Sequence, residues 1–444
     1  MPLPGIRLVL CHVQLRFPTD GFRQGVHASA GHPAHCRAGP GLLGIRFIDE
    51  NVQPATEDDL RWADVVFTTG MHIQREQITG IIARAHNAGK AVVLGGPSAS
   101  AAPEWYPEAD VIHCGEVGDA TDRLFELLDR SPDRLPEQFI LHTVERLPMT
   151  EWPMPAYHLI NIRNYLLGTV QFSSGCPLTC EFCDIPALYG RRPRHKHPAQ
   201  IIRELDFLAA AGAPSVYFVD DNFIGDPQAT RELLAHLVVW QEKWDGRVRL
   251  SCEATLGLAK HPDILAQMRA AFFTNVFCGI ETPEPTALRA IKKTVNLQNP
   301  ILEVIDTLNG YGIEVAGGLI MWFDTDTENT PQAIADFIRA SQAPIQTVNL
   351  LYALPKTPLY ERLKAAGRIV DDDQHDSNIQ FLQPYEQVVA DWRRVVAGAY
   401  EPKALYQRYA TQAKKPIPIG VAPNTCSAKP RRATFTEPAP CSPG

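Results

Sequence analysis

Three cysteines on one short loop are the residues of this sequence best suited to chemistry. Cys176, Cys180 and Cys183 follow a C-x3-C-x2-C spacing, directly after an apolar run at residues 165–172. Three thiolates on one loop can converge on a metal without help from distant parts of the chain. Three cysteines within eight residues are not a pattern of a hydrophobic core, so the spacing predicts a metal centre and favours iron–sulfur.

The number of these cysteines suggests an open coordination position. A [4Fe–4S] cube usually takes four thiolates, and a closed structural zinc site also takes four ligands. Three cysteines would leave one iron free to bind a substrate or cofactor, whereas a saturated cluster mainly carries electrons. Two alternatives stay open at this point. They are a zinc site completed by His195 or His197, and buried thiols without metal.

The composition is that of a globular protein of two or three domains. The chain has 444 residues, of which 45% are apolar and 21% charged. A net charge of −8 gives no electrostatic case for nucleic-acid binding. No apolar run has the length of a membrane span, and the short run at residues 6–10 lacks the basic flank of a signal peptide. Ten cysteines without a wider pairing pattern favour the cytoplasm.

The elements around this loop must come from an α/β fold, and residues 1–131 predict a Rossmann-like domain. Short apolar runs alternate with helical segments there, which is typical of a parallel sheet covered on both faces. The predicted strands are residues 5–13, 45–49, 65–70, 91–94 and 111–115.

Residues 14–43 are the exception, because they have neither helical nor strand periodicity. Their composition resembles out-of-frame translation of GC-rich DNA. We predict compensating frame errors near residues 13 and 43, and translation of the other frames should recover a periodic apolar helix.

Polar, glycine-bearing loops follow three of the predicted N-terminal strands, where ligands bind in parallel sheets. Each loop alone is equally consistent with a tight turn. The loop residues are Gly70, Met71 and His72, then Gly95, Gly96, Pro97 and Ser98, then Gly115 and Glu116.

The second half of the chain predicts a partial (β/α)6 TIM-like barrel at residues 165–365, reached through a proline-rich linker at residues 132–164. A helical module with several aromatic residues follows at 366–413 and could form a substrate lid. Residues 414–444 should be disordered. Cys252 and Cys278 lie inside predicted strands and are expected to be core thiols.

Polar residues end several of the predicted barrel strands, where catalytic groups of such barrels lie. Helix capping or a solvated loop is the alternative role for each of them. They are Asp220, Asp221, Asn222, Glu253 and Glu281.

The cluster loop resembles the signature of the radical S-adenosylmethionine (SAM) enzymes, C-x3-C-x-aromatic-C, with Phe182 as the aromatic residue. The resemblance implies that the three cysteines hold a [4Fe–4S] cube and that SAM occupies the fourth iron. Reduction then cleaves SAM to a 5′-deoxyadenosyl radical. It also implies SAM contacts from Phe182 and the strand-end residues, with Asp220, Asp221 and Asn222 at the amino group and Glu281 near the ribose; Glu253 is a further candidate.

Further segments resemble the cobalamin-dependent radical SAM methyltransferases, the family of hopanoid C-2 methylase and the bacteriochlorophyll side-chain methylases. They are residues 183–186, 189–191, 219–225 and 354–359, and the likeness runs from about residue 44 to 412. It implies that the three N-terminal loops bind cobalamin. The sequence has no D-x-H-x-x-G motif, so a histidine ligand to cobalt is not supported.

The same resemblance implies a reaction and its partners. The radical would remove hydrogen from an unactivated carbon, and methylcobalamin would then supply the methyl group. The expected substrate is apolar, of hopanoid or tetrapyrrole type, and the electron donor a flavodoxin or ferredoxin. Two other hypotheses stay open: a radical SAM enzyme of another reaction type, such as an oxidative cyclase with a degenerate B12 domain, and a zinc-binding interaction module.

Overall fold

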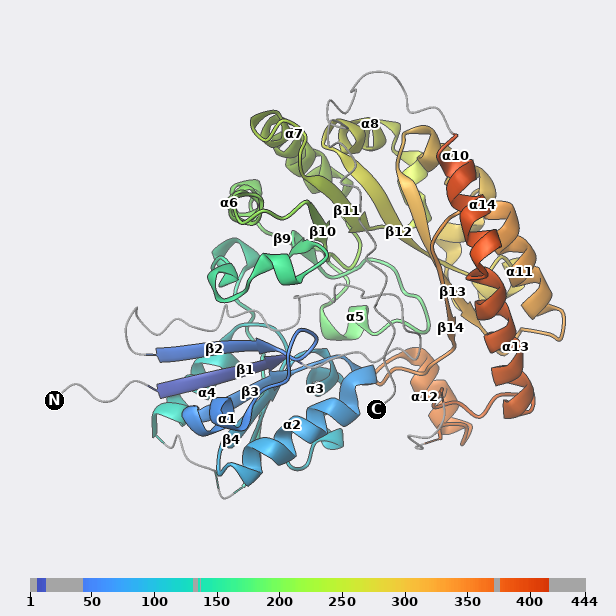
Figure 1. Cartoon of the computed structure of the whole chain (residues 1–444). Helices are drawn as coiled ribbons and strands as arrows, with labels where there is room; N and C mark the ends of the chain where they lie inside the picture. Colours follow the sequence, from blue (N-terminus) through green and yellow to red (C-terminus); the bar gives the residue numbers. More distant parts are fainter. Residues whose placement is uncertain (1–5, 13–42, 131–134, 136, 371–375, 415–444) are drawn as a thin grey trace, which may run out of the picture.

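The computed structural model describes residues 6–12, 43–130, 135, 137–370 and 376–414 (Figure 1). The predicted frame-shifted segment, apart from the backbone of its last residue, and the predicted disordered tail after Lys414 lie outside these residues. Two parallel six-stranded sheets and one short hairpin make up the strands of the described chain. No helix in this part of the chain combines the length and the apolar character needed to cross a membrane.

The N-terminal sheet is parallel throughout, with the strand order β2-β1-β3-β4-β5-β6. Its strands are β1 (Ile6–His12), β2 (Leu43–Asp49), β3 (Val65–Thr69), β4 (Ala91–Gly95), β5 (Val111–Cys114) and β6 (Phe139–His142). The connecting helices are α1 (Glu57–Trp62), α2 (Arg75–Asn87), α3 (Pro97–Ala101) and α4 (Asp119–Arg130).

Helices cover both faces of this sheet. Since successive side chains of a strand point to opposite faces, each strand contributes to the apolar packing on both sides. Val66 packs in one apolar cluster with Ile78 of α2, whereas its neighbour Val65 packs in another with Leu124 of α4. This two-sided burial explains the continuous apolar strands and confirms the predicted Rossmann-like architecture.

Strand β6 corrects the predicted domain boundary at residue 131. It lies within the segment expected to be a linker, yet it pairs with β5 and completes the N-terminal sheet. Its four residues alternate between half-buried and exposed, as expected for an edge strand. So short a strand in a proline-rich context gives no recognisable periodic pattern.

The barrel is an open parallel sheet with the order β14-β13-β12-β11-β10-β7, which confirms the predicted partial barrel. Its strands are β7 (Gly168–Val170), β10 (Ser215–Phe218), β11 (Arg249–Glu253), β12 (Phe273–Glu281), β13 (Glu314–Met321) and β14 (Gln346–Leu350). The main helices are α6 (Pro198–Ala210), α7 (Pro227–Lys243), α8 (Pro262–Ala270), α10 (Ile301–Gly310), α11 (Thr330–Ser341) and α12 (Pro358–Ala365). The two-residue strands β8 (Ser173–Ser174) and β9 (Arg194–His195) pair antiparallel at the two ends of the segment that carries the cysteine loop.

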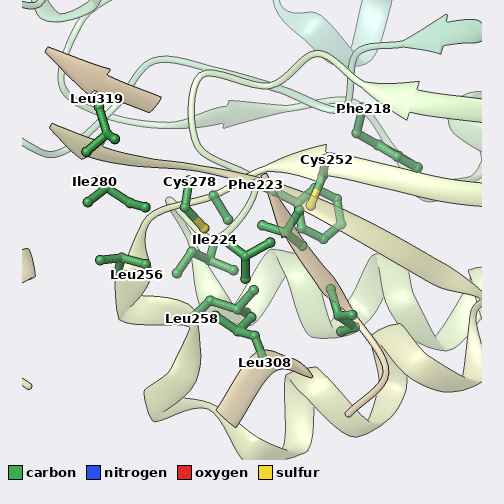
Figure 2. Packing of buried hydrophobic residues seen from close by; sticks show 14 of the residues in the cluster. Phe218, Phe223, Ile224, Cys252, Leu256, Leu258, Cys278, Ile280, Leu308 and Leu319 are labelled. Carbon is green, nitrogen blue, oxygen red and sulfur yellow. The ribbon is translucent and has the colours of Figure 1, made fainter. Parts of the chain in front are cut away.

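Aromatic and aliphatic side chains fill the space beneath the barrel strands (Figure 2). The rings of Phe218, Phe223 and Phe273 lie 5.3–5.6 Å apart, centroid to centroid. Full burial of such a ring contributes roughly 1.5–3 kcal/mol to stability. Cys252 and Cys278 are fully buried in this core, as expected of structural thiols.

The C-terminal helices α13 (Tyr385–Ala399) and α14 (Pro402–Gln412) cover the outer edge of the barrel (Figure 1). Trp392 donates from its indole nitrogen to the carbonyl of Val348, and the Tyr400 hydroxyl donates to that of Gln346, both at 2.8 Å. Both acceptors belong to edge strand β14, and Gln346 begins it. The lid prediction is therefore wrong for these two aromatic residues, which protect a sheet edge.

Candidate active site

The three cysteines lie between strand β8 and helix α5 (Ile185–Leu188), a helix that sits between the two sheets (Figure 1). Cys176 and Cys180 are buried, Cys183 is partly buried, and all three are free thiols. Burial raises the pKa of each thiol, although the Lys293 ammonium opposes this shift at Cys176 and Cys180. As thiolates, these groups would need the positive charge of a bound metal in place of the water they lose.

Backbone hydrogen bonds from distant segments hold the cysteine loop in place. The amide of Cys176 donates to the Gly190 carbonyl at 3.1 Å, and that of Glu181 donates to the Ile291 carbonyl at 2.9 Å. The Glu181 carbonyl in turn accepts from the amide of Leu359 at 3.0 Å. Hydrogen bonds from the surrounding fold thus help to define the conformation of the loop.

The donor set of this loop fits an iron–sulfur cube better than a single ion. Within the described residues no group of three or more His, Cys, Asp or Glu side chains is arranged to hold one metal ion. In a cube each thiolate binds a different iron, so the three sulfurs need not meet at one point. His197 is exposed at the start of α6, and His195 packs its ring against Phe172 at 5.2 Å.

The two aspartates after β10 hold the strand that leads into the cysteine loop. One carboxylate oxygen of Asp220 accepts a hydrogen bond from the Ser173 amide, and Asp221 accepts one from the Gly175 amide at 2.6 Å. The other oxygen of Asp220 is buried and has no hydrogen-bond partner among the described residues. This arrangement leaves an acceptor free beside the loop.

Acids gather at these strand ends without a basic partner; Asp220 is buried, and Asp221 and Glu253 are partly buried. Burial raises the pKa of Asp220 to about 7, of Asp221 to about 6 and of Glu253 to about 7. None of the three forms an ion pair within the described part of the chain. Asn222 is also buried, and its side-chain oxygen accepts from the Thr255 amide at 3.4 Å. A ligand with an ammonium and a sulfonium group, such as SAM, fits this excess of buried negative charge.

Glu281 differs from the other acids because the protein itself supplies its counter-ion. The Lys293 ammonium lies 2.7 Å from a carboxylate oxygen of Glu281, and both side chains are buried. Glu281 has a φ of +66°, a strained conformation at the end of β12. Lys293 also lies 6.0 Å from the ring of Phe182, which packs against Phe323. Sequence reasoning missed Lys293, since a lysine in a loop carries no periodic signal.

The three glycine-bearing loops of the N-terminal domain lie at the carboxyl ends of β3, β4 and β5. Gly96 and Gly115 have φ values of +91° and +106°, which favour glycine. The imidazole of His72 lies 3.3 Å from the Ser98 hydroxyl and 3.6 Å from the carboxylate of Asp184, next to Cys183. Met71 instead exposes about half of its side chain. The other predicted cobalamin residues of these loops are Gly70, Gly95 and Pro97.

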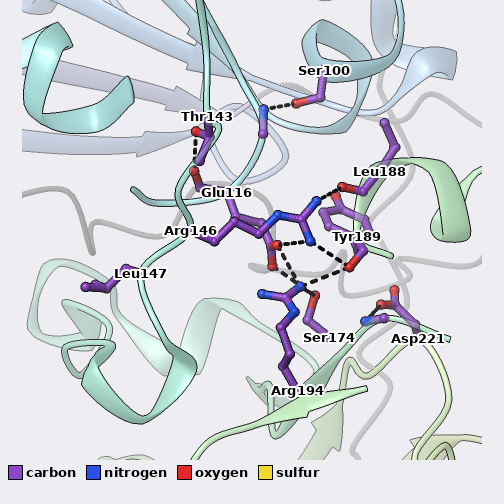
Figure 3. A network of polar contacts seen from close by, with 12 residues as sticks. Ser100, Glu116, Thr143, Arg146, Leu147, Ser174, Leu188, Tyr189, Arg194 and Asp221 are labelled. Carbon is purple, nitrogen blue, oxygen red and sulfur yellow. Dashed lines mark hydrogen bonds and ion pairs between the residues drawn. The ribbon is translucent and has the colours of Figure 1, made fainter. Parts of the chain in front are cut away.

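Glu116 is bound to the cysteine-loop side of the interface (Figure 3). One carboxylate oxygen accepts from the Ser174 hydroxyl at 2.9 Å, and the other lies 2.7 Å from Arg194. Arg146 lies 3.3 Å from the same oxygen and donates to the Tyr189 carbonyl at 2.8 Å. The side chain of Glu116 therefore joins the two domains, which leaves the loop backbone as the group that could contact cobalamin.

Sequence comparison gives this geometry its context. Residues 170–338 match the Radical SAM superfamily, and residues 357–433 match a domain of unknown function, DUF4070. Hopanoid C-2 methylase of Rhodopseudomonas palustris (strain TIE-1) is 51% identical over 396 residues, covering 89% of this chain and 74% of that protein. The chain belongs to the cobalamin-dependent radical SAM methyltransferase family. Members of this family use a [4Fe–4S] cluster, SAM and cobalamin, so the zinc-module hypothesis is wrong.

Other members of the family and two solved structures extend this result. Bacteriochlorophyllide d C-12(1)-methyltransferase of Chlorobaculum tepidum is 23% identical and covers 82% of this chain and 80% of that one. The fold matches that of the radical SAM methyltransferase TsrM of Kitasatospora setae with a TM-score of 0.66, at 16% identity and 89% coverage of both chains. The cobalamin-dependent radical SAM enzyme OxsB matches with a TM-score of 0.65 at 15% identity, covering 88% of this chain and 66% of that one.

Proposed function

We propose that this enzyme methylates a hopanoid-type polycyclic lipid at C-2. The observation that carries the proposal is the 51% identity to hopanoid C-2 methylase, which extends over both the N-terminal domain and the barrel. The identity to the bacteriochlorophyllide methyltransferase is less than half as high. A tetrapyrrole is therefore the second candidate substrate.

In this proposal Cys176, Cys180 and Cys183 hold the cluster, which supplies the electron that cleaves SAM. Asp220, Asp221 and Glu253 balance the positive charges of SAM, because they are acids without a basic partner and desolvation raises the pKa of each. Asp220 and Asp221 also orient the cysteine loop through the hydrogen bonds that they accept from its backbone.

Further side chains complete the proposed SAM site. Phe182 and Glu281 border it, and Lys293 fixes the orientation of Glu281 through their buried ion pair. Asn222 positions the start of the next strand-end loop by binding the amide of Thr255.

Cobalamin would bind between the N-terminal loops and the barrel. Gly70, His72 and Ser98 approach one another at the ends of β3 and β4, and the positive φ angles of Gly96 and Gly115 let the backbone come close to a ligand. His72 already contacts Ser98 and Asp184, so its role is to shape the pocket wall. No cobalt ligand is assigned.

The test is an anaerobic reconstitution followed by a substrate competition. Iron, sulfide, corrinoid and reductive SAM cleavage are measured together, with about four iron per chain expected. The reconstituted enzyme then receives SAM with an isotope-labelled methyl group, and either an unmethylated hopanoid or a bacteriochlorophyllide. We expect label at one carbon of the hopanoid and none in the tetrapyrrole. Label in the tetrapyrrole alone would show that the proposed substrate is wrong. SAM cleavage with an unmethylated cyclised product would show that the proposed reaction type is wrong.

A further inference from the structure

The basic run at residues 191–197 divides into an inward and an outward set. Arg194 and Lys196 turn inward, where they pair with Glu116 and Glu204 at 2.7 Å each. Arg191 and Arg192 are exposed, and neither forms an ion pair with a residue that the structure describes. The internal structure thus accounts for half of these charges and leaves two guanidinium groups facing solvent.

These two arginines belong to the segment that covers the first cysteine of the cluster loop. The Gly190 carbonyl accepts the Cys176 amide at 3.1 Å, and the Arg191 guanidinium donates to the Pro177 carbonyl at 3.3 Å. At Gly175 an added Cβ would lie 3.0 Å from the carbonyls of Gly190 and Arg192. The backbone of residues 190–192 therefore lies between the two exposed guanidinium groups and Cys176.

The other sides of the cluster loop are bordered by different charged groups. Next to Cys183, Asp184 meets His72, so the N-terminal domain covers that side. Next to Cys180, Glu181 pairs with Arg362, which also binds Asp324. Arg368 binds Asp324 as well, so this network holds two arginines and two carboxylates. Arg289 and Lys292, which flank Ile291 beside this network, are both exposed and define the rival surface.

We propose that Arg191 and Arg192 form the docking surface for an acidic one-electron carrier protein of the flavodoxin or ferredoxin class. This proposal rests on the proposed function, since radical SAM chemistry needs an electron from outside. Because the chain carries a net charge of −8, an acidic partner needs a local positive patch to approach it. A local pair of arginines steers such a partner, and electron-transfer encounters need only a small, transient interface.

The transfer itself is balanced without any other reactant. The reduced carrier gives up one electron and the oxidised cluster takes it up, with no proton or leaving group involved. The hydrogen bond between Cys176 and Gly190 offers a short route from the docking surface to the sulfur.

The experiment compares two charge-matched double variants of the reconstituted full chain. Arg191→Gln with Arg192→Gln removes the proposed surface. Arg247→Gln with Arg249→Gln removes two exposed arginines at the start of β11, the opposite end of the strand from the site. Cluster reduction is followed by stopped-flow absorbance and EPR, with reduced flavodoxin or with dithionite as donor, at low and high salt.

We expect the first double variant to slow reduction by flavodoxin about tenfold at low salt, because electrostatic steering accelerates encounters by factors of ten or more. High salt should remove the difference. Arg191→Lys with Arg192→Lys should keep most of the rate, since the charge remains. Iron content and reduction by dithionite should match the parent enzyme in every variant.

Equal slowing by the control pair, or no slowing by either pair, overturns the proposal. A larger effect from Arg289→Gln with Lys292→Gln also overturns it, because the carrier would then dock beside Glu181. Binding of the arginine pair to anionic vesicles or RNA, with no change in flavodoxin kinetics, overturns it as well. Failure of dithionite-driven SAM cleavage in the parent enzyme instead rejects the proposed function, so the two failures are distinguishable.

Discussion

Two sets of carboxylates in this protein differ in their partners. Those at the barrel strand ends have no basic partner, whereas Glu116 at the domain interface has two. Asp220 is buried and Glu253 partly buried, neither has a basic partner, and desolvation raises the pKa of each to about 7. Glu116 is also buried, but Arg194 and Arg146 both approach it. A buried charge that the protein pairs serves to hold structure together, whereas one left unpaired costs stability unless a ligand supplies the counter-charge.

The largest expected effect comes from removing a cluster ligand. Cys180→Ala should reduce iron from about four per chain to near zero and abolish SAM cleavage, because two thiolates do not hold a cube. Cys278→Ala is the matched control, since Cys278 is a fully buried core thiol. Its iron content should stay unchanged. Iron analysis, EPR and single-turnover SAM cleavage measure the outcome, and a normal cluster in Cys180→Ala would refute the assignment.

The next effect tests whether the unpaired acids bind a cation. Asp220→Asn keeps an oxygen that can accept the Ser173 amide but removes the negative charge. We expect the Kd for SAM to rise about tenfold, equivalent to about 1.4 kcal/mol, with the cluster still assembled. Equilibrium binding to the reconstituted enzyme measures it. If the Kd stays constant while the free energy of unfolding falls, Asp220 serves the loop and not the cofactor.

A pH profile sharpens the same comparison at Glu253. Its pKa rises from 4.5 in the unfolded chain to about 7 in the folded one, because burial destabilises the carboxylate. Folded protein without SAM should therefore lose stability as pH rises from about 4.5 to 7, by an amount on the order of 2–3 kcal/mol. Glu253→Gln should flatten this part of the profile. Denaturant unfolding across this pH range checks it, and an unchanged slope in the variant would contradict it.

Removing the ion pairs of Glu116 should lower protein stability and corrinoid retention, and should leave the affinity for SAM unchanged. Glu116→Gln leaves Arg194 and Arg146 without their carboxylate and should lower the free energy of unfolding by roughly 1–3 kcal/mol. We expect corrinoid retention to fall while iron content and the Kd for SAM stay near those of the parent enzyme. Thermal unfolding and corrinoid absorbance measure these quantities. A selective loss of SAM binding would instead place Glu116 in the cofactor site.

The smallest change in stability is expected on replacing Arg362, an arginine that is paired but exposed to solvent. Arg362 joins Glu181 and Asp324 on the surface and keeps about half of its side chain exposed. Because solvent screens such pairs, Arg362→Gln should cost less than about 1 kcal/mol. Its unfolding midpoint in denaturant should lie close to that of the parent enzyme. A loss as large as that of Glu116→Gln would show that exposure does not separate the two networks.

Local patterns in the sequence were enough to predict the cluster loop, the alternation of strands and helices, and the family. These features depend on local spacing: three cysteines on one loop, and apolar runs separated by helical segments. The strand-end acids were also identified, because residues that end parallel strands share one edge of the sheet. The short edge strand β6 was missed, since four residues of mixed exposure give no periodic signal.

Only the tertiary structure decided how the charges are partnered. Arg194 and Arg191 stand three positions apart in one basic run, yet one is bound to Glu116 and the other faces solvent. Lys293 reaches Glu281, and Trp392 reaches β14, across distances in sequence that no local pattern encodes. Ion pairs and buried contacts form between groups that the folded backbone brings within a few ångströms, so sequence spacing supplies the candidates and packing selects among them.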